Sequence, residues 1–216
     1  VNVGLIKKLR FEDFFTQITE KATVTNQMGA YPYNPVKNGD EKYLQSSNKA
    51  NGSKSTITSE FQKPSVLSFE YMVSEEGSTS TSSNYGLIIK RNGTQIAGFE
   101  EVSDAWKTYQ ISADAGDKIT LAYSCYKNDY SMTPSDENWL RLKNFNAEPL
   151  TKVTFDGMPE NAVITVRRNA EVITPADGKY LLPAGIYEYE VKAFGYETIS
   201  ARSITLDGAK ESMTET

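Results

Sequence analysis

The stretch that decides the fold is Ser65-Val66-Leu67-Ser68-Phe69-Glu70-Tyr71-Met72-Val73. Successive side chains of a β-strand point to opposite faces, so a strand with one buried face places large apolar residues at every second position. This stretch follows that pattern over nine residues. It therefore predicts a half-buried strand. The side chains expected to face the core are Leu67, Phe69, Tyr71 and Val73.

Similar short runs continue from about residue 55 onwards, separated by Gly, Asn, Asp, Ser and Pro. Residues 87–91 and 94–97 flank Asn92-Gly93, a dipeptide that accepts positive φ at both central positions of a tight hairpin turn. Residues 106–111 and 118–124 have the composition of two more strands. The sequence therefore predicts an all-β protein.

The N-terminal segment allows two interpretations. From Leu5 to Ala22, apolar residues recur partly at three- and four-residue spacing, which indicates a helix. Alternatively, Phe11 to Phe14 could begin the first strand. Further along, residues 77–84 contain no apolar side chain and are expected to form a loop.

A change in composition at residues 146–150 suggests a linker between two domains. Five strand-like runs follow within about 65 residues, which suits a small β-sandwich. We therefore expect one domain over residues 1–148 and a second over residues 149–216. The five runs are Lys152 to Asp156, Ala162 to Arg168, Lys179 to Leu182, Ile186 to Lys192 and Ser203 to Leu206.

Composition excludes several classes of function. The 216 residues contain no His and a single Cys, Cys125. Nucleophile pairs with an imidazole base and His-ligated zinc sites are therefore excluded. The net charge of −5, with scattered cations, makes nucleic acid an unexpected partner. No apolar run is long enough to span a membrane. We expect no cofactor, and because the chain begins with Val1, we expect a processed or excised piece of a longer protein.

The stretch from about Asn48 to Phe145 contains a series of short pieces, namely Asn51 to Ser55, Leu67 to Glu76, Asn92-Gly93 with Trp106, Ala115 to Asp117, Tyr126 to Asp129 with Asp136, and Trp139-Leu140. In their order and spacing, these pieces resemble the jelly-roll domains, related to MAM and carbohydrate-binding modules, of large bacterial surface proteins. The resemblance implies an N-terminal jelly-roll β-sandwich. Such domains often fix a structural calcium through an Asp of the last strand, but this run carries Arg141 and Lys143, so no metal is expected.

The C-terminal part, from about Lys152 to Leu206, contains a second series of pieces, namely Val153 to Phe155, Pro159 to Val166, Leu182 to Tyr187 and Gly195 to Glu197. These pieces resemble a PEGA-type, carboxypeptidase regulatory-like domain. The resemblance implies a smaller Ig-like sandwich that serves for spacing or presentation. A pilin-like isopeptide bond promoted by Glu190 is not expected, because Lys152 alternates out of phase with its apolar neighbours and no matching late Asn is present.

Aromatic residues in loop-like contexts are the candidate ligand-binding residues. Sugar rings stack on exposed aromatic side chains through their apolar C–H faces. We expect Trp106 to lie in the core instead, and Cys125 to pack as a small apolar residue. The candidate glycan platform consists of Tyr31, Tyr33, Tyr126, Tyr130 and Trp139.

Acidic residues do not predict a catalytic site. The adjacent pairs at 75–76, 100–101 and 136–137 would point to opposite faces of a strand, so they do not form the close carboxylate pair that glycoside hydrolysis requires. A metal cluster could be assembled from Glu12, Asp13, Asp129 and Asp136, but salt bridges or plain exposure are favoured.

The sequence thus predicts a non-catalytic module of a secreted or wall-associated bacterial protein, acting in adhesion or as a spacer. The alternative is a carbohydrate-binding module of a larger extracellular enzyme. The expected partners are a glycan or a host or cell-surface protein, together with further domains of the same polypeptide.

Overall fold

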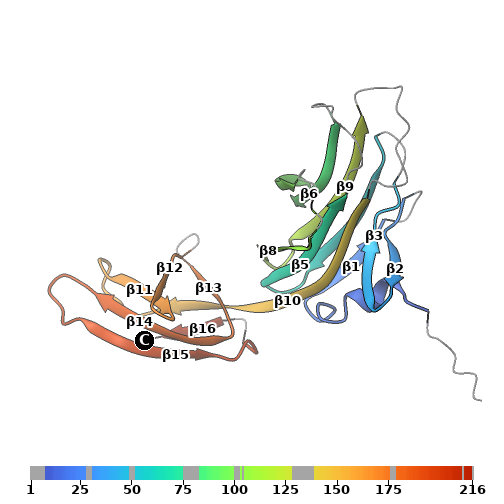
Figure 1. Ribbon diagram of the computed structural model, residues 1–216. Coiled ribbons are helices and arrows are strands. Elements are labelled where there is room, and N and C mark those ends of the chain that lie inside the picture. The colour runs from blue at the N-terminus through green and yellow to red at the C-terminus, as the bar shows by residue number, and fades with distance from the viewer. Residues whose placement is uncertain are drawn as a thin grey trace, which may run out of the picture. The chain divides into compact units, whose positions relative to one another are not determined.

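The computed structural model describes residues 8–27, 31–48, 52–74, 83–99, 103, 105–127, 139–175, 179–210 and 212–215. The chain divides into two compact units (Figure 1). Unit 1 comprises Val1–Gln62 and Leu67–Ala147, and unit 2 comprises Lys63–Val66 and Glu148–Thr216. Among the described residues, no helix is long and apolar enough to cross a membrane.

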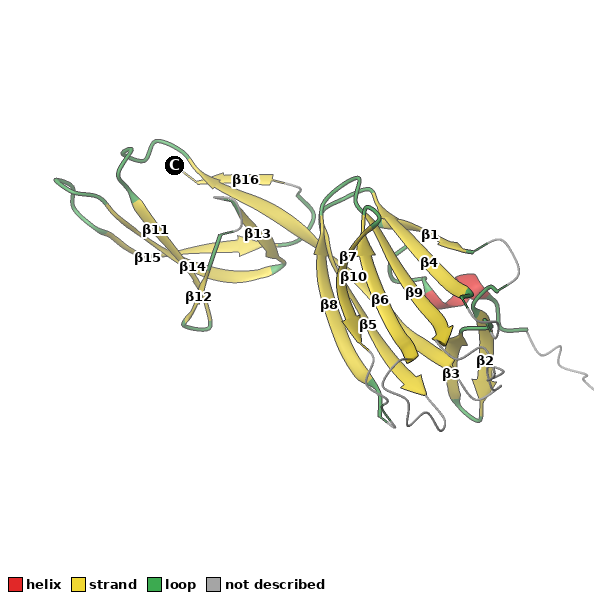
Figure 2. Cartoon of the chain, turned by 90° about the horizontal axis from the view of Figure 1, so that it is seen from above, coloured by secondary structure: helices red, strands yellow, loops and turns green. Residues whose placement is uncertain are grey.

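Unit 1 is a β-sandwich of two five-stranded sheets, which we name sheet A and sheet B (Figure 2). Sheet A has the order β1-β4-β9-β6-β7, with β1 at Ala22–Asn26, β4 at Lys54–Phe61, β9 at Lys118–Lys127, β6 at Ser83–Arg91 and β7 at Thr94–Phe99. Sheet B has the order β2-β3-β10-β5-β8, with β2 at Asn34–Asn38, β3 at Glu41–Gln45, β10 at Trp139–Phe155, β5 at Ser65–Ser74 and β8 at Lys107–Ala113.

Alternating apolar side chains fill the space between the two sheets. In β5, buried and half-buried residues alternate over all ten positions, as predicted. Phe69 stacks on Phe145, with ring centroids 5.8 Å apart, at the centre of this core. Burying rings of this size is the largest apolar contribution to the stability of such a sandwich. The prediction of an all-β sandwich is therefore confirmed.

The hairpin predicted around Asn92-Gly93 is present. It joins β6 to β7, and both turn residues have positive φ, 50° at Asn92 and 87° at Gly93. The side-chain amide of Asn92 also donates a hydrogen bond to Asp117 Oδ1 at 2.7 Å, which ties this turn to the start of β9. The dipeptide therefore fixes the register in which β6 and β7 pair beside the turn.

The prediction of a helix from Leu5 to Ala22 is wrong for the described residues 8–22. They form one short 3₁₀ helix, η1 at Phe11–Phe14, then turns, and β1 begins at Ala22. The alternative, that Phe11 to Phe14 begin the first strand, is wrong as well. Phe15 packs on Phe145 with ring centroids 4.6 Å apart, so local turns bury these rings without a long amphipathic helix.

Unit 2 is a smaller sandwich. One layer consists of three strands: the last residues of β10, β13 at Tyr180–Pro183 and β16 at Ser212–Glu215. Both β13 and β16 pair with β10. The other is sheet D, in the order β12-β11-β14-β15, with β12 at Glu171–Ile173, β11 at Val163–Arg168, β14 at Gly185–Lys192 and β15 at Ile199–Leu206. Val166, Tyr187 and Tyr189 lie in the core between the two layers.

Candidate functional site

The five predicted platform residues do not lie in equivalent environments. Tyr31 is half-buried in a bend, and Trp139 is half-buried at the start of β10. Tyr126 belongs to β9, but its side chain lies outside the described residues, as does Tyr130 altogether. The loop predicted at residues 77–84 also falls largely outside them, and its last two residues belong to β6.

Tyr33 is a core residue, and its prediction as part of an exposed platform is wrong. Its side chain is only 1% exposed, and Asn26 holds its backbone through two hydrogen bonds of 2.8 and 2.9 Å. Burial raises the pKa of the Tyr33 hydroxyl well above 10, and neighbouring Tyr123 adds to the rise. A ring in this position offers no face to a sugar.

Trp139 begins a series of contacting aromatic and cationic side chains on the face of sheet B that points away from the core. The guanidinium of Arg141 lies 3.6 Å from the centroid of Trp139 and 4.5 Å from that of Tyr43. Tyr43 lies 6.2 Å from Trp106, and the ammonium of Lys143 lies 3.8 Å from the Trp106 centroid. These five residues form one continuous cluster, in which Tyr43 is buried beneath its neighbours. We call this cluster the ladder.

Strand geometry explains the position of the ladder. Leu140 and Leu142 are fully buried in the core, so the residues between and beside them point to the opposite face of β10. In the register, Arg141 lies opposite Gln45, and its Nε donates a hydrogen bond of 3.0 Å to Gln45 Oε1. Tyr43 is only 2% exposed although it points away from the core, because Arg141 and Trp106 cover it.

The carboxylate of Glu41 connects Trp106 with Lys143 at one end of the ladder. Oε1 of Glu41 accepts hydrogen bonds from the indole Nε1 of Trp106 at 2.8 Å and from Nζ of Lys143 at 2.6 Å. These interactions, chiefly the hydrogen bond from Lys143, hold the pKa of the Glu41 carboxyl below its usual value near 4.5. Glu41 therefore stays ionised at neutral pH.

A second carboxylate, that of Glu70 in β5, also lies near Lys143, beside a bulge in β10. Asn144 has a φ of 54°, and both Lys143 and Asn144 point away from the core before Phe145 returns to it. Asn tolerates this left-handed conformation better than most residues do. The Asn144 amide donates to Glu70 Oε1 at 2.9 Å, while Glu70 Oε2 lies 3.7 Å from Lys143 Nζ.

The position of Trp106 corrects a sequence prediction. We expected Trp106 in the core, but it is half-buried in the ladder and lies outside the core cluster of unit 1. It precedes β8, yet it contacts residues of β3 and β10, which lie beyond β5 in the sheet order. Its indole N–H needs a partner, and Glu41 supplies one at the surface.

The sequence analysis also missed Glu41 and Tyr43. Both lie in β3, which forms a hairpin with β2 through the turn after Asn38. Gly39 in that turn has a φ of 62°. The dipeptide Gly39-Asp40 was the available signal, because Asn38 pairs with Glu41 and Gly-Asp between two strands is typical of a two-residue hairpin turn.

The acidic residues considered for metal binding do not gather in the described part of the chain. Backbone N–H of Arg10 donates to Asp13 Oδ2 at 2.9 Å, and the Arg10 guanidinium lies 3.7 Å from Oδ1, so Asp13 is an ion-pair partner. Asp129 and Asp136 fall outside the described residues. Within those residues, no three His, Cys, Asp or Glu side chains form a group that could hold a metal ion.

Chemically, the ladder is suited to binding. The half-buried rings of Trp106 and Trp139 offer apolar area, and the surrounding amides, carboxylates and cations offer hydrogen bonds. Glu41 and Glu70 both approach Lys143, which would suggest the paired acids of a glycosidase. A glycosidase needs one carboxyl with a raised pKa as the proton donor, and the pKa of Glu41 is lowered.

No protein-family model matches the chain, and no curated protein matches its sequence. The solved structures that are similar to part of it include the following two. The secreted serine protease VesC from Vibrio cholerae is 20% identical with a TM-score of 0.39, over 50% of this chain and 21% of the protease, so this chain matches about a fifth of that protein. The CBM22-2 xylan-binding domain of Xyn10C from Paenibacillus barcinonensis is 14% identical with a TM-score of 0.38, over 58% of this chain and 91% of the domain. At this level of similarity, neither structure indicates what this chain binds.

Proposed function

We propose that unit 1 is a non-catalytic carbohydrate-binding module whose binding surface is the ladder. The observation that carries this proposal is the continuous stack from Trp139 through Arg141 and Tyr43 to Trp106 on one sheet face. Stacked rings whose orientation is fixed by cations and hydrogen bonds present rigid apolar surface at low entropic cost, which is what a pyranose ring needs.

The charges of this surface favour a neutral polysaccharide. The described ladder and its neighbours carry two cations, Arg141 and Lys143, and two carboxylates, Glu41 and Glu70. Lys143, Glu41 and Glu70 form one ion-paired network with one excess negative charge, and Arg141 balances it, so these four groups leave no net charge to attract an anionic chain. A neutral glycan would be recognised by stacking and hydrogen bonding, and its affinity would change little with salt.

Affinity electrophoresis of the whole chain in gels that contain xylan, mannan, mixed-linkage glucan or polygalacturonate tests the proposal. We expect at least one neutral polysaccharide to retard the native chain. Trp139→Ala and Trp106→Ala should each weaken binding roughly fivefold, since an aromatic contact contributes about 1 kcal/mol. Phe194→Ala, which removes an exposed ring of unit 2, is the matched control and should bind like the native chain.

Two outcomes would contradict the proposal. One is the absence of retardation by every polysaccharide in the panel. The other is retardation that survives both tryptophan substitutions. Release of reducing sugar from a retarding polysaccharide, abolished by Glu70→Gln, would instead make the module an enzyme.

The second candidate function is adhesion or spacing by a secreted or wall-associated bacterial protein that contains further domains. What favours it is the exposure of large apolar side chains in unit 2, most of all Phe194 at 91%. Large exposed apolar groups in a soluble domain often mark a surface that another molecule covers. Fractionation of the producing cells, with the chain found in the medium or the wall, would support this location, and recovery from the cytoplasm would contradict it.

A further inference from the structure

One end of unit 2 presents two aromatic side chains on a tight turn. The turn at 193–198 joins β14 to β15 and is closed by a hydrogen bond of 3.2 Å from Tyr196 N–H to the carbonyl oxygen of Ala193. Gly195 has a φ of 83°, a conformation that favours glycine. This geometry holds Phe194 and Tyr196 at the tip, where they are 91% and 68% exposed.

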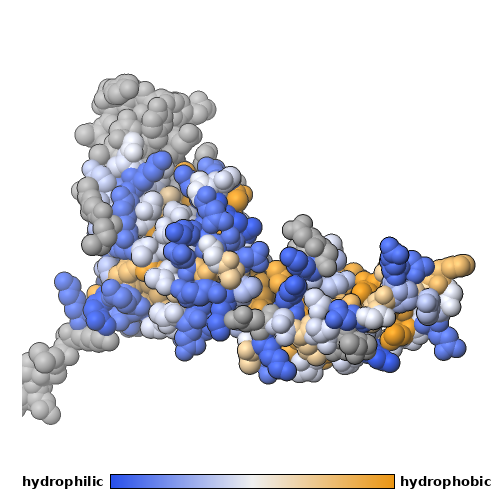
Figure 3. Space-filling model, turned by 180° about the vertical axis from the view of Figure 1, so that it is seen from behind, coloured by the Kyte–Doolittle hydropathy of each residue, from blue (hydrophilic) through white to orange (hydrophobic). Residues whose placement is uncertain are grey.

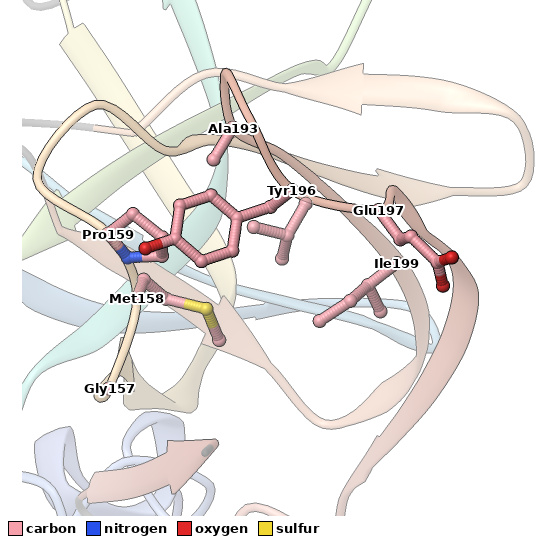
Figure 4. Close-up of a pocket in the computed structure, with 8 residues that line it drawn as sticks. Gly157, Met158, Pro159, Ala193, Tyr196, Glu197 and Ile199 are labelled. Carbon is pink, nitrogen blue, oxygen red and sulfur yellow. The ribbon is translucent and has the colours of Figure 1, made fainter.

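Tyr196 also forms a wall of a pocket of about 350 Å³. Figure 4 shows its ring beside Met158 and Pro159, with Ile199 between the ring and Glu197. The apolar lining comes from two turns and from the ends of β14 and β15, and Glu197 supplies a carboxylate beside it. The pocket therefore combines an exposed ring, an apolar lining and one negative charge.

The surroundings of the pocket are acidic. Asp156, Glu160 and Glu197 are exposed in the two turns at 156–162 and 193–198, and neither turn contains Lys or Arg. The neighbouring cation, Lys192, forms an ion pair with Glu190. Figure 3 shows hydrophobic side chains at the surface of unit 2 among hydrophilic ones. The two turns thus present apolar surface together with unbalanced negative charge.

We propose that this pocket binds a lysine or arginine side chain of a partner protein. The methylene stem of such a side chain fits the apolar lining of Met158 and Ile199. Its cationic head then reaches the carboxylate of Glu197 or the face of the Tyr196 ring, both of which attract a cation. This inference rests on the adhesion role proposed above as the second candidate and names the chemistry of its partner.

The charges decide against a membrane as the occupant. An exposed Phe194 could insert into a lipid surface, but bacterial and cytoplasmic lipid surfaces are anionic, and interfacial binding depends on basic residues near the inserted ring. Here the two turns at 156–162 and 193–198 carry three carboxylates and no Lys or Arg. They repel an anionic surface and attract a basic polypeptide.

The test is a titration of the ¹⁵N-labelled whole chain, followed by amide chemical shifts. The probes are acetylated, amidated peptides Gly-Lys-Gly and Gly-Arg-Gly, with Gly-Gln-Gly as the neutral control. We expect saturable shifts at Tyr196, Glu197 and Ile199 with the two basic peptides and none with the neutral one. Tyr196→Ala and Glu197→Gln should each weaken binding roughly two- to fivefold, as expected for an exposed cation contact.

Two variants sharpen the result. Tyr196→Phe retains the ring and should bind like the native chain. Ile186→Ala removes an equally exposed apolar side chain, 67% exposed, at the opposite end of β14, and should also leave binding unchanged. The three substituted side chains, Tyr196, Glu197 and Ile186, lie at the surface, so each of the four variants is expected to fold, and its amide spectrum shows this directly.

The proposal would be overturned by equal shifts with the neutral peptide, by shifts that do not involve Tyr196 or Glu197, or by no shift at all. Binding of the chain to phosphatidylglycerol vesicles that Phe194→Ala abolishes would assign the turn to a membrane instead. None of these measurements uses a glycan or the ladder, so failure here leaves the carbohydrate proposal intact.

Discussion

The guanidinium of Arg141 lies 3.6 Å from the centroid of the Trp139 ring, and its Nε donates a hydrogen bond to Gln45. Stacking and hydrogen bonding act on the same planar group, so Arg141 fixes the orientation of the indole ring. Lysine cannot reproduce this arrangement, because its ammonium is a point charge without a planar face.

We expect Arg141→Lys to weaken polysaccharide binding by roughly fivefold while leaving the fold intact, since a cation–π contact at a partly exposed site contributes about 1 kcal/mol. Affinity electrophoresis measures the binding, and near-ultraviolet circular dichroism should show a weaker tryptophan signal. Unchanged affinity together with an unchanged spectrum would contradict a positioning role for Arg141.

Glycan binding should depend on pH through Glu41. Its pKa in the folded chain is depressed, so its interactions with Lys143 and Trp106 are present above the usual value near 4.5 and are lost as the pH falls through the folded pKa. Affinity should therefore be constant from about pH 9 to about pH 5 and fall only in more acidic solution.

Glu41→Gln is the matched variant for this experiment, because glutamine still accepts the hydrogen bond from Trp106 but does not titrate. Its affinity should no longer show the acidic decline. A decline of equal size in the native chain and in Glu41→Gln would assign the pH dependence to another group.

Asn144→Ala should destabilise unit 1. The left-handed φ of 54° costs an alanine about 1 kcal/mol, and loss of the hydrogen bond to Glu70 adds about 1 kcal/mol more. Asn144→Gly keeps the backbone conformation and should lose less. Urea unfolding measures both free energies, and equal stability of the alanine variant and the native chain would contradict the strain argument.

Tyr33→Phe should stabilise the chain by about 1 kcal/mol, because the Tyr33 hydroxyl is buried and finds no hydrogen-bond partner among the described residues. Burial also raises its pKa, so the folded state keeps its proton when the unfolded chain loses it. Stability therefore falls as the pH rises above about 10.

Urea unfolding at neutral and at alkaline pH tests both statements about Tyr33. The variant should be more stable than the native chain at neutral pH and lose less stability in alkali. A destabilised Tyr33→Phe variant would show that the hydroxyl makes a favourable contact.

Alternation along a strand was the reliable part of the sequence analysis. It predicted β5 with its buried face, and the dipeptide Asn92-Gly93 predicted the hairpin between β6 and β7. Both signals are local, because side-chain direction and turn conformation depend on adjacent residues. Short strands such as β12, with three residues, have too few positions to show a period.

The candidate site was predicted less well, for a different physical reason. A large ring is equally compatible with a core and with a surface, and distant residues decide between them. Trp106 lies at the surface because Glu41, 65 residues away in the sequence, accepts its N–H. Tyr33 is buried because the backbone around it is tied to Asn26, whereas its flanking sequence resembles an exposed loop.

The bulge at Asn144 also supplies a marker for recognising chains of this kind. It places two residues, rather than one, between the inward-facing Leu142 and Phe145. A homologue with only one residue between these apolar positions would keep the sandwich. It would lose either the ammonium of Lys143, which contacts both carboxylates, or the amide of Asn144, which binds one of them. The number of residues between these two apolar positions in an aligned sequence therefore distinguishes chains that share only the architecture from chains that also share the proposed recognition surface.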